Sequence, residues 1–214
     1  MIIVAAVALV AWAYLLLLHG RFWQAGPMLR AAWPAEAPPV DIVIPARDEA
    51  AGIEATLRSL LAQDYAGEMR IIVVDDGSAD GTGGITRAIS DERLLVIDGA
   101  ERPAGWSGKL WAVQQGVAQS TAGLVLLTDA DIVHDPAHVS TLVAKAERDR
   151  LDLVSEMVAL RAVSAAERAL VPAFVFFFQL LYPFARVNDP RSRVAAAAGG
   201  TMLVRRAALE RIGG

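Results

Sequence analysis

The sequence contains no cysteine and only three histidines among its 214 residues. Without cysteine there is no disulfide framework, no zinc–thiolate site and no thiol nucleophile. His19, His134 and His138 lie near no Gly-x-Ser-x-Gly elbow and form no His-Glu-x-x-His motif, which argues against a serine hydrolase site and a zinc site. The net charge is −4 and the basic residues are scattered, which argues against nucleic acid as a partner.

Two common phosphate-binding motifs are also missing. Gly108-Lys109 is followed by Leu110 instead of Ser or Thr, and Pro103 stands where a P-loop has its first glycine. No Gly-x-Gly-x-x-Gly follows the first predicted strand, so we expect no dinucleotide site of the Rossmann type. Lys109 remains of interest because a lysine at a helix start can meet a pyrophosphate together with backbone N–H groups. The alternative is a solvated surface lysine.

Charged residues are missing from the first 18 positions. This apolar run reaches the lower length for a membrane-spanning helix, and it lacks the basic n-region and cleavage site of a signal peptide. We therefore expect an uncleaved transmembrane anchor at residues 1–24. Arg21 and Arg30 follow the run, so the positive-inside rule predicts a domain on the cytoplasmic side of the inner membrane. A Pro-rich linker at residues 25–38 leads to a domain at 39–214.

Apolar runs and amphipathic stretches alternate after the linker. Strands are predicted at Val40–Ile44, Met69–Val74, Leu94–Ile97 and from Leu124 to the acids that follow it. Helices are predicted at Ala50–Gln63, around Ile85–Ile89, at Lys109–Gln119 and at Ala137–Arg148. This order predicts an α/β fold with a mostly parallel sheet that is covered by helices on both faces.

The last third of the chain has a different pattern. Asp152–Leu160 and Ala195–Val204 are predicted strands, and Gly199-Gly200 suggests a close backbone approach in the second of them. Between them, Ala169–Phe184 is rich in aromatic residues and too short to span a membrane. It is either a buried core helix or a helix that lies at the membrane interface with its aromatic side chains among the acyl chains.

Two clusters of acidic residues stand at predicted strand ends. Asp75-Asp76 follows one four-residue aliphatic run, and Asp129-Ala130-Asp131 follows another. Ligands of open α/β sheets bind beyond the carboxyl ends of the strands, and Mg²⁺ or Mn²⁺ often joins one or two carboxylates to substrate phosphates. Each cluster alone could be a turn former or a helix cap. Together they indicate a site for a nucleotide diphosphate.

These residues resemble a known family in their order and spacing. The matching motifs are Val43–Glu49, Val74–Ser78, Gly108-Lys109 and Asp129-Ala130-Asp131, and they resemble the donor half of family 2 glycosyltransferases. The resemblance implies the GT-A fold and transfer of a sugar from a nucleotide diphosphate. The N-terminal run, the aromatic segment and Ala195–Gly200 resemble the hopanoid-associated branch, which implies a lipid acceptor.

The resemblance also implies roles for individual residues. Pro45, Ala46, Arg47 and Glu49 would line the base and ribose. Asp76 would accept a hydrogen bond from the uracil N–H of a UDP-sugar, and Asp75 would shape the turn. Lys109 would lie near the diphosphate, Asp129 near the ribose or donor sugar, and Asp131 would bind Mg²⁺ or Mn²⁺. A metal on the diphosphate would stabilise charge on the leaving group.

The family's acceptor-activating carboxylate has no counterpart in the sequence. It usually follows the Gly-Gly strand and its helix, which here reach Ile212, so we expect the base beyond Gly214 and do not assign it to Asp189 or Glu156. Two alternatives remain open. A nucleotidyltransferase would usually carry a Gly-rich loop after the first strand, and the Pro45–Glu49 segment has no glycine. The other alternative is a membrane-tethered module that binds nucleotide sugars without turnover.

Overall fold

The computed structural model describes residues 1–24 and 26–213, which form two compact units. The sheet unit comprises Arg30–Val158 and Ala197–Gly214, and the helical unit comprises Met1–Leu29 and Ala159–Ala196. Each unit therefore joins segments that are far apart in the sequence.

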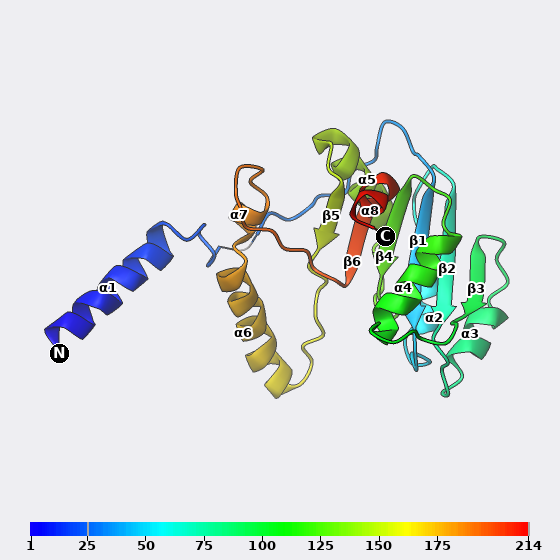
Figure 1. Ribbon diagram of the computed structural model, residues 1–214, viewed down its shortest axis with the longest axis horizontal. Helices are drawn as coiled ribbons and strands as arrows, with labels where there is room; N and C mark the ends of the chain where they lie inside the picture. Colours follow the sequence, from blue (N-terminus) through cyan, green and yellow to red (C-terminus); the bar gives the residue numbers. More distant parts are fainter. Residues whose placement is uncertain (25, 214) are drawn as a thin grey trace. The chain divides into compact units, whose positions relative to one another are not determined.

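The sheet unit is built on six strands in the order β3-β2-β1-β4-β6-β5 (Figure 1). The strands are β1 (Val40–Ala46), β2 (Met69–Asp75), β3 (Leu94–Asp98), β4 (Leu124–Thr128), β5 (Leu153–Glu156) and β6 (Thr201–Arg205). The first four strands run parallel, and β6 is antiparallel to both β4 and β5. The expected α/β arrangement is present, and its sheet is mixed.

Five helices belong to the sheet unit: α2 (Ile53–Leu61), α3 (Thr82–Ala88), α4 (Gly108–Gln119), α5 (His138–Asp149) and α8 (Arg206–Ile212). Side chains on both faces of the central strands are fully buried, as continuous apolar runs predict. On one face Val43, Ile72 and Val125 form a core cluster that residues of α4 and α8 cover. Helix α4 lies so close to this face that a Cβ atom at Gly116 would stand 2.4 Å from Val43 Cγ1.

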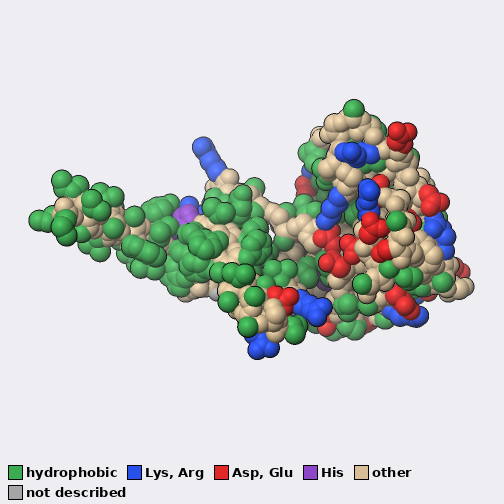
Figure 2. Space-filling model, turned by 90° about the horizontal axis from the view of Figure 1, so that it is seen from below, with side chains coloured by type: hydrophobic (Ala, Val, Ile, Leu, Met, Phe, Trp, Pro, Cys, Tyr) green, Lys and Arg blue, Asp and Glu red, His purple; other side chains and the backbone are tan. Residues whose placement is uncertain are grey.

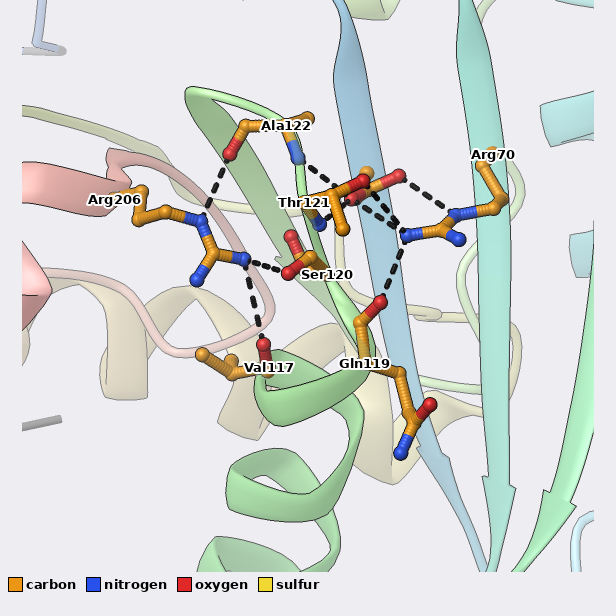
Figure 3. Close-up of polar contacts among 8 residues, drawn as sticks. Arg70, Val117, Gln119, Ser120, Thr121, Ala122 and Arg206 are labelled. Atoms are coloured by element: carbon orange, nitrogen blue, oxygen red, sulfur yellow. Dashed lines mark hydrogen bonds and ion pairs between the residues drawn. The ribbon is translucent and has the colours of Figure 1, made fainter.

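A polar network joins the loop between α4 and β4 to its neighbours (Figure 3). The buried Asp41 carboxylate accepts from Arg70 Nε at 3.0 Å and from the backbone N–H groups of Thr121 and Ala122 at 2.7 and 2.9 Å. Burial raises the pKa of Asp41, but Arg70 and these N–H groups outweigh it and lower the pKa below its ordinary value. Arg206 donates to the carbonyls of Ala122 and Ser120 from the other side.

The helical unit holds α1 (Ile2–Leu17), α6 (Ala165–Leu181) and α7 (Phe184–Val187). Residues 18–24 pack onto the end of α6: the His19 ring nitrogen Nε2 lies 2.7 Å from the Leu180 carbonyl oxygen, and the Phe22 ring meets Phe176 edge-on at 5.3 Å. Arg186 Nη2 donates to the Leu18 carbonyl at 2.6 Å. Phe22 is 3% exposed, so it is the centre of this small core.

The transmembrane helix expected at residues 1–24 is a wrong prediction. Helix α1 has 16 residues, and no helix in residues 1–24 and 26–213 is both long and apolar enough to cross a membrane. The helix ends at Leu17 because the chain then turns, with Gly20 and Arg21 at φ of 65° and 51°.

Other predicted boundaries shift in the last third of the chain. The aromatic segment forms α6, which starts at a capping box of Ser164 and Glu167 and has no buried residue, so it is not a buried core helix. The strand expected at Asp152–Leu160 is shorter, and the one expected at Ala195–Val204 begins only at Thr201. Of the close approach expected at Gly199-Gly200, only the Gly200 part is present: a Cβ atom there would lie 3.0 Å from Val158 Cγ2, whereas one at Gly199 would meet nothing within 4 Å.

Candidate functional site

The carboxyl ends of β1, β2 and β4 meet at one edge of the sheet. Ala46 pairs with Asp75 in register, and the Asp76 N–H donates to the Ala46 carbonyl at 2.9 Å. The loops that follow these strands therefore carry Arg47, Asp76 and Asp129 to the same edge. Pro45 stands opposite Val74, where β1 approaches the edge.

Asp76 is held between a cation and two glycines. Arg47 Nη1 lies 3.3 Å from its Oδ2 atom; the Arg47 side chain is 65% exposed and that of Asp76 only 15%. A Cβ atom at Gly108 would stand 3.1 Å from Asp76 Oδ2, and one at Gly99 would stand 3.2 Å from Asp76 Cα. The Asp76 carboxylate thus has a fixed position with an exposed guanidinium beside it.

Asp75 faces into the fold. It is buried, and its Oδ1 atom accepts from the Ser78 N–H at 3.0 Å, which closes the turn after β2. Arg87 Nη1 lies 4.0 Å from Asp75 Oδ2, and Arg87 Nη2 lies 2.5 Å from Asp98. These contacts are those of a residue that shapes the turn.

Side chains connect the loops after β1 and β2. The Asp48 N–H donates to Ser78 Oγ at 3.0 Å, and the Ala79 N–H donates to Asp48 Oδ1 at 2.8 Å. Asp48 has a φ of 55°, a left-handed conformation that Asp tolerates better than most residues. The Glu49 N–H donates to Thr82 Oγ1 at 2.8 Å. This bond fixes the backbone of Glu49.

The charges of several nearby side chains act on the Glu49 carboxyl. Burial raises the pKa of Glu49, and the charges of Asp131, Asp129 and Asp80 raise it further, while Lys109 acts in the opposite direction. The structure therefore brings Glu49 and the Asp129-Ala130-Asp131 motif into one electrostatic neighbourhood. Repulsion of this kind is relieved when a cation binds.

Lys109 and Asp129 form an ion pair. Lys109 Nζ lies 2.5 Å from Asp129 Oδ1, and Lys109 is the second residue of α4, whose N-cap Ser107 accepts from the Leu110 N–H. The Asp129 N–H donates to the Gly200 carbonyl at 3.0 Å. Both side chains are partly exposed, so the pair can open toward a ligand.

Helix α2 supports the backbone around Asp131. Thr56 Oγ1 donates to the Ala130 carbonyl at 2.8 Å, and a Cβ atom at Gly52 would lie 3.5 Å from Asp131 Cα. The described site thus combines an exposed arginine, a lysine at a helix start and a group of carboxylates at the end of a parallel sheet.

The sequence model of one protein family, glycosyl transferase family 2, matches residues 41–213. The chain belongs to glycosyl transferase family 2. A probable glycosyltransferase, YdaM of Bacillus subtilis, is 27% identical over 185 residues, which cover 84% of this chain and 43% of YdaM. The 4,4'-diaponeurosporenoate glycosyltransferase of Staphylococcus aureus is 34% identical over 91 residues, which cover 42% of this chain and 23% of that protein. The chain thus spans less than half the length of both relatives.

A solved structure shares the fold. The mannosyltransferase PcManGT from Pyrobaculum calidifontis, in complex with GDP-Man and Mn²⁺, superposes with a TM-score of 0.68. The identity is 24%, and the match covers 98% of this chain and 57% of that one. This likeness supports the GT-A fold that the resemblance implied.

The carboxylates of this family 2 site fit a divalent metal whose other ligands come from a bound substrate. In the part of the chain that the structure describes, no three Asp, Glu or His side chains are placed to hold a metal ion by themselves. Mg²⁺ is usually bound by one or two carboxylates together with substrate phosphates, and the partly exposed carboxylates at this edge offer such ligands. Asp131 is the residue expected from the sequence to bind the metal, while Asp129 pairs with Lys109.

Two histidines that the sequence analysis assigned to no site lie beside the end of β4. His134 Nε2 lies 3.2 Å from Thr128 Oγ1, and the rings of His134 and His138 lie 4.6 Å apart. His138 contacts Thr201 Oγ1 at 3.2 Å and Glu156 Oε2 at 3.1 Å. The spacing of four residues between the histidines was the only available signal.

The two acids that were not assigned as the base are both paired. Glu156 is engaged by His138, while Asp189 in the helical unit pairs with Arg191.

Proposed function

We propose that the sheet unit binds a nucleotide-diphosphate sugar and supports its transfer to an acceptor, in the manner of a glycosyltransferase. The observation that carries this proposal is the convergence of Asp76 with Arg47, and of Asp129 with Lys109, at one edge of the sheet. The first pair offers an acceptor for base N–H groups, and the second offers a cation for phosphates. A donor that has a base at one end and a diphosphate at the other would use both.

The charged groups have complementary tasks in this proposal. Lys109 and the N–H groups at the start of α4 neutralise the diphosphate, and Asp76 orients the base. A divalent metal held by Asp131 would stabilise the charge on the departing nucleotide. Sugar transfer benefits because stabilisation of the leaving group lowers the barrier to breaking the bond between sugar and phosphate.

The base of the donor is proposed to be uracil. The Asp76 carboxylate can accept from the N–H of uracil, but also from the N–H groups of guanine. The PcManGT structure contains GDP-Man, so UDP and GDP are the two ligands to compare. Tighter binding of UDP would support uracil, and tighter binding of GDP would replace it with guanine.

The acceptor is proposed to be a lipid at the cytoplasmic face of the membrane. One relative carries the name 4,4'-diaponeurosporenoate glycosyltransferase, and the helical unit exposes many apolar side chains. The sequence resemblance to the hopanoid-associated branch favours a hopanoid as that lipid. Nucleotide sugars are made in the cytoplasm, which favours this side of the membrane.

Calorimetry with UDP and GDP, with and without Mn²⁺, tests the donor site. Asp131→Asn is expected to remove the Mn²⁺-dependent part of the affinity, and Asp76→Ala to weaken binding about tenfold with or without metal, the loss of one charge-assisted hydrogen bond. Asp149→Asn changes an acid on α5 that pairs with Lys145 and should leave binding unchanged. Equal, metal-independent binding to wild type and Asp131→Asn would refute the assignment. Release of UDP from a UDP-sugar separates turnover from binding alone.

A further inference from the structure

Helix α6 of the helical unit presents an apolar stripe that nothing in the described chain covers. Leu170, Phe174, Phe177 and Leu181 recur at intervals of four, three and four residues and therefore share one face of the helix. Their exposed fractions are 68, 57, 59 and 69%. Large apolar side chains in a continuous exposed row usually mark an interaction site. Figure 2 shows hydrophobic side chains over most of the visible surface of this unit.

The opposite side of α6 is already occupied. Phe176 packs against the buried Phe22, and the Leu180 carbonyl contacts the His19 ring. Arg186, just beyond the helix, binds the Leu18 carbonyl. These contacts fix α6 against residues 18–24, so that the Leu170–Leu181 stripe is the face left for an external partner.

Charge is divided unequally between the two units. The helical unit contains six arginines and two acids, a net charge of +4, whereas the remaining 14 basic and 22 acidic residues give the sheet unit a net charge of −8. Glu167 is engaged in the cap of α6 and Asp189 in an ion pair with Arg191. Among the described residues no acid pairs with Arg21, Arg161, Arg168 or Arg193. An apolar stripe within a basic unit matches a surface that is both apolar and anionic.

We infer that the helical unit docks on the surface of an anionic lipid bilayer, with α6 lying in the interface and its Leu170–Leu181 stripe among the acyl chains. Interfacial helices combine a hydrophobic face with basic residues, and they bind through buried apolar area and attraction to anionic headgroups. Trp23 and Tyr182 are 41 and 40% exposed in the same unit, and such aromatic residues suit the headgroup level. In this inference the acidic sheet unit takes no part in binding the anionic bilayer.

Vesicle flotation of the full chain tests this inference. We expect binding to vesicles of equimolar phosphatidylcholine and phosphatidylglycerol, weaker binding to phosphatidylcholine alone, and a decrease with added salt. Phe177→Gln should weaken binding about tenfold because one apolar anchor is lost. Arg168→Gln should weaken it about fivefold on the anionic vesicles only. The matched controls are Ile212→Gln and Arg148→Gln, which change exposed residues of the sheet unit.

Four results would overturn the inference, the first three of them in the flotation assay itself. These are an absence of binding to the anionic vesicles, equal binding to both vesicle types, and binding that Phe177→Gln leaves unchanged relative to Ile212→Gln. A fourth is concentration-dependent dimerisation without lipid that Phe177→Gln abolishes, since the stripe would then bind a second copy of the chain. The assay measures no sugar transfer or nucleotide binding, so its outcome is independent of the proposed reaction.

Discussion

At the scale of single residues, side-chain contacts between neighbouring loops position the acids at the strand ends. Asp76 and Asp129 could be predicted because each follows an apolar run, and apolar runs identify buried parallel strands. The bonds that connect Asp48 to Ser78 and Ala79 join loops about 30 residues apart, with Asp48 at a positive φ. No local pattern encodes such a pairing, because it depends on how β1 and β2 are brought side by side.

The burial of His134 predicts a pH dependence of the free energy of unfolding. Burial, with a smaller effect of the His138 charge, lowers the pKa of His134 from 6.5 to about 4. Above pH 6.5 the imidazole is neutral in both the folded and the unfolded chain. As the pH is lowered from 6.5 to about 4, only the unfolded chain takes up this proton. The free energy of unfolding therefore decreases as the pH decreases, by about 3 kcal/mol in total.

Urea unfolding of wild type and His134→Gln across this pH range checks the prediction. Because the variant lacks the titrating group, its free energy of unfolding should depend less steeply on pH between 6.5 and 4. The difference between the two proteins removes the contribution of the acids that titrate in the same range. Parallel curves for the two proteins would contradict a buried neutral imidazole at position 134.

At the scale of elements, the parallel half of the sheet was predictable, whereas for β5 and β6 the strands could be predicted but not their antiparallel order. Strands β1, β2 and β4 and helix α5 lie close to the expected ranges because short apolar runs and amphipathic periods are local signals. The insertion of β6 between β4 and β5 depends on pairings such as Thr128 with Thr201, which no local signal reveals. Helix α1 was predicted too long because hydropathy alone does not register the turn at Gly20 and Arg21.

The network around Asp41 predicts how the loop between α4 and β4 is stabilised. Asp41→Asn would place an amide N–H₂ group against the donors of Arg70, Thr121 and Ala122, which now surround the buried carboxylate. Removing one partner of a buried charge network leaves the others unpaired, so we expect a loss of about 3 kcal/mol in the free energy of unfolding.

Chemical denaturation at neutral pH measures this loss. The control is Asp149→Asn, which also removes an acid paired with basic side chains, but at the surface of α5. Surface ion pairs contribute little, so the control should lose far less stability than Asp41→Asn. Similar losses in the two variants would show that burial of Asp41 does not set the strength of the network.

At the scale of the whole molecule, each of the two units is made of two segments that are separated in the sequence by a segment of the other unit. The sheet unit takes its last strand from beyond Ala196, and the helical unit joins the first residues to the segment Ala159–Ala196. The predicted division into an anchor at 1–24, a linker at 25–38 and a domain at 39–214 is linear, so it contains no unit made of two separate segments. Such pairings of distant segments depend on tertiary packing, as the burial of Phe22 against Phe176 illustrates.

Phe22→Ala tests whether the helical unit is stabilised by its own small core. Phe22 is 3% exposed, and its ring contacts those of His19, Trp23 and Phe176. Truncating a buried phenylalanine costs about 3–5 kcal/mol where the surroundings do not collapse. We expect faster amide hydrogen exchange in residues 18–24 and 176–187, with exchange in β1 and β2 and the affinity for UDP unchanged. Trp23→Ala, which removes an exposed ring of the same segment, is the control. Increased exchange throughout the sheet unit would show that the two units unfold together.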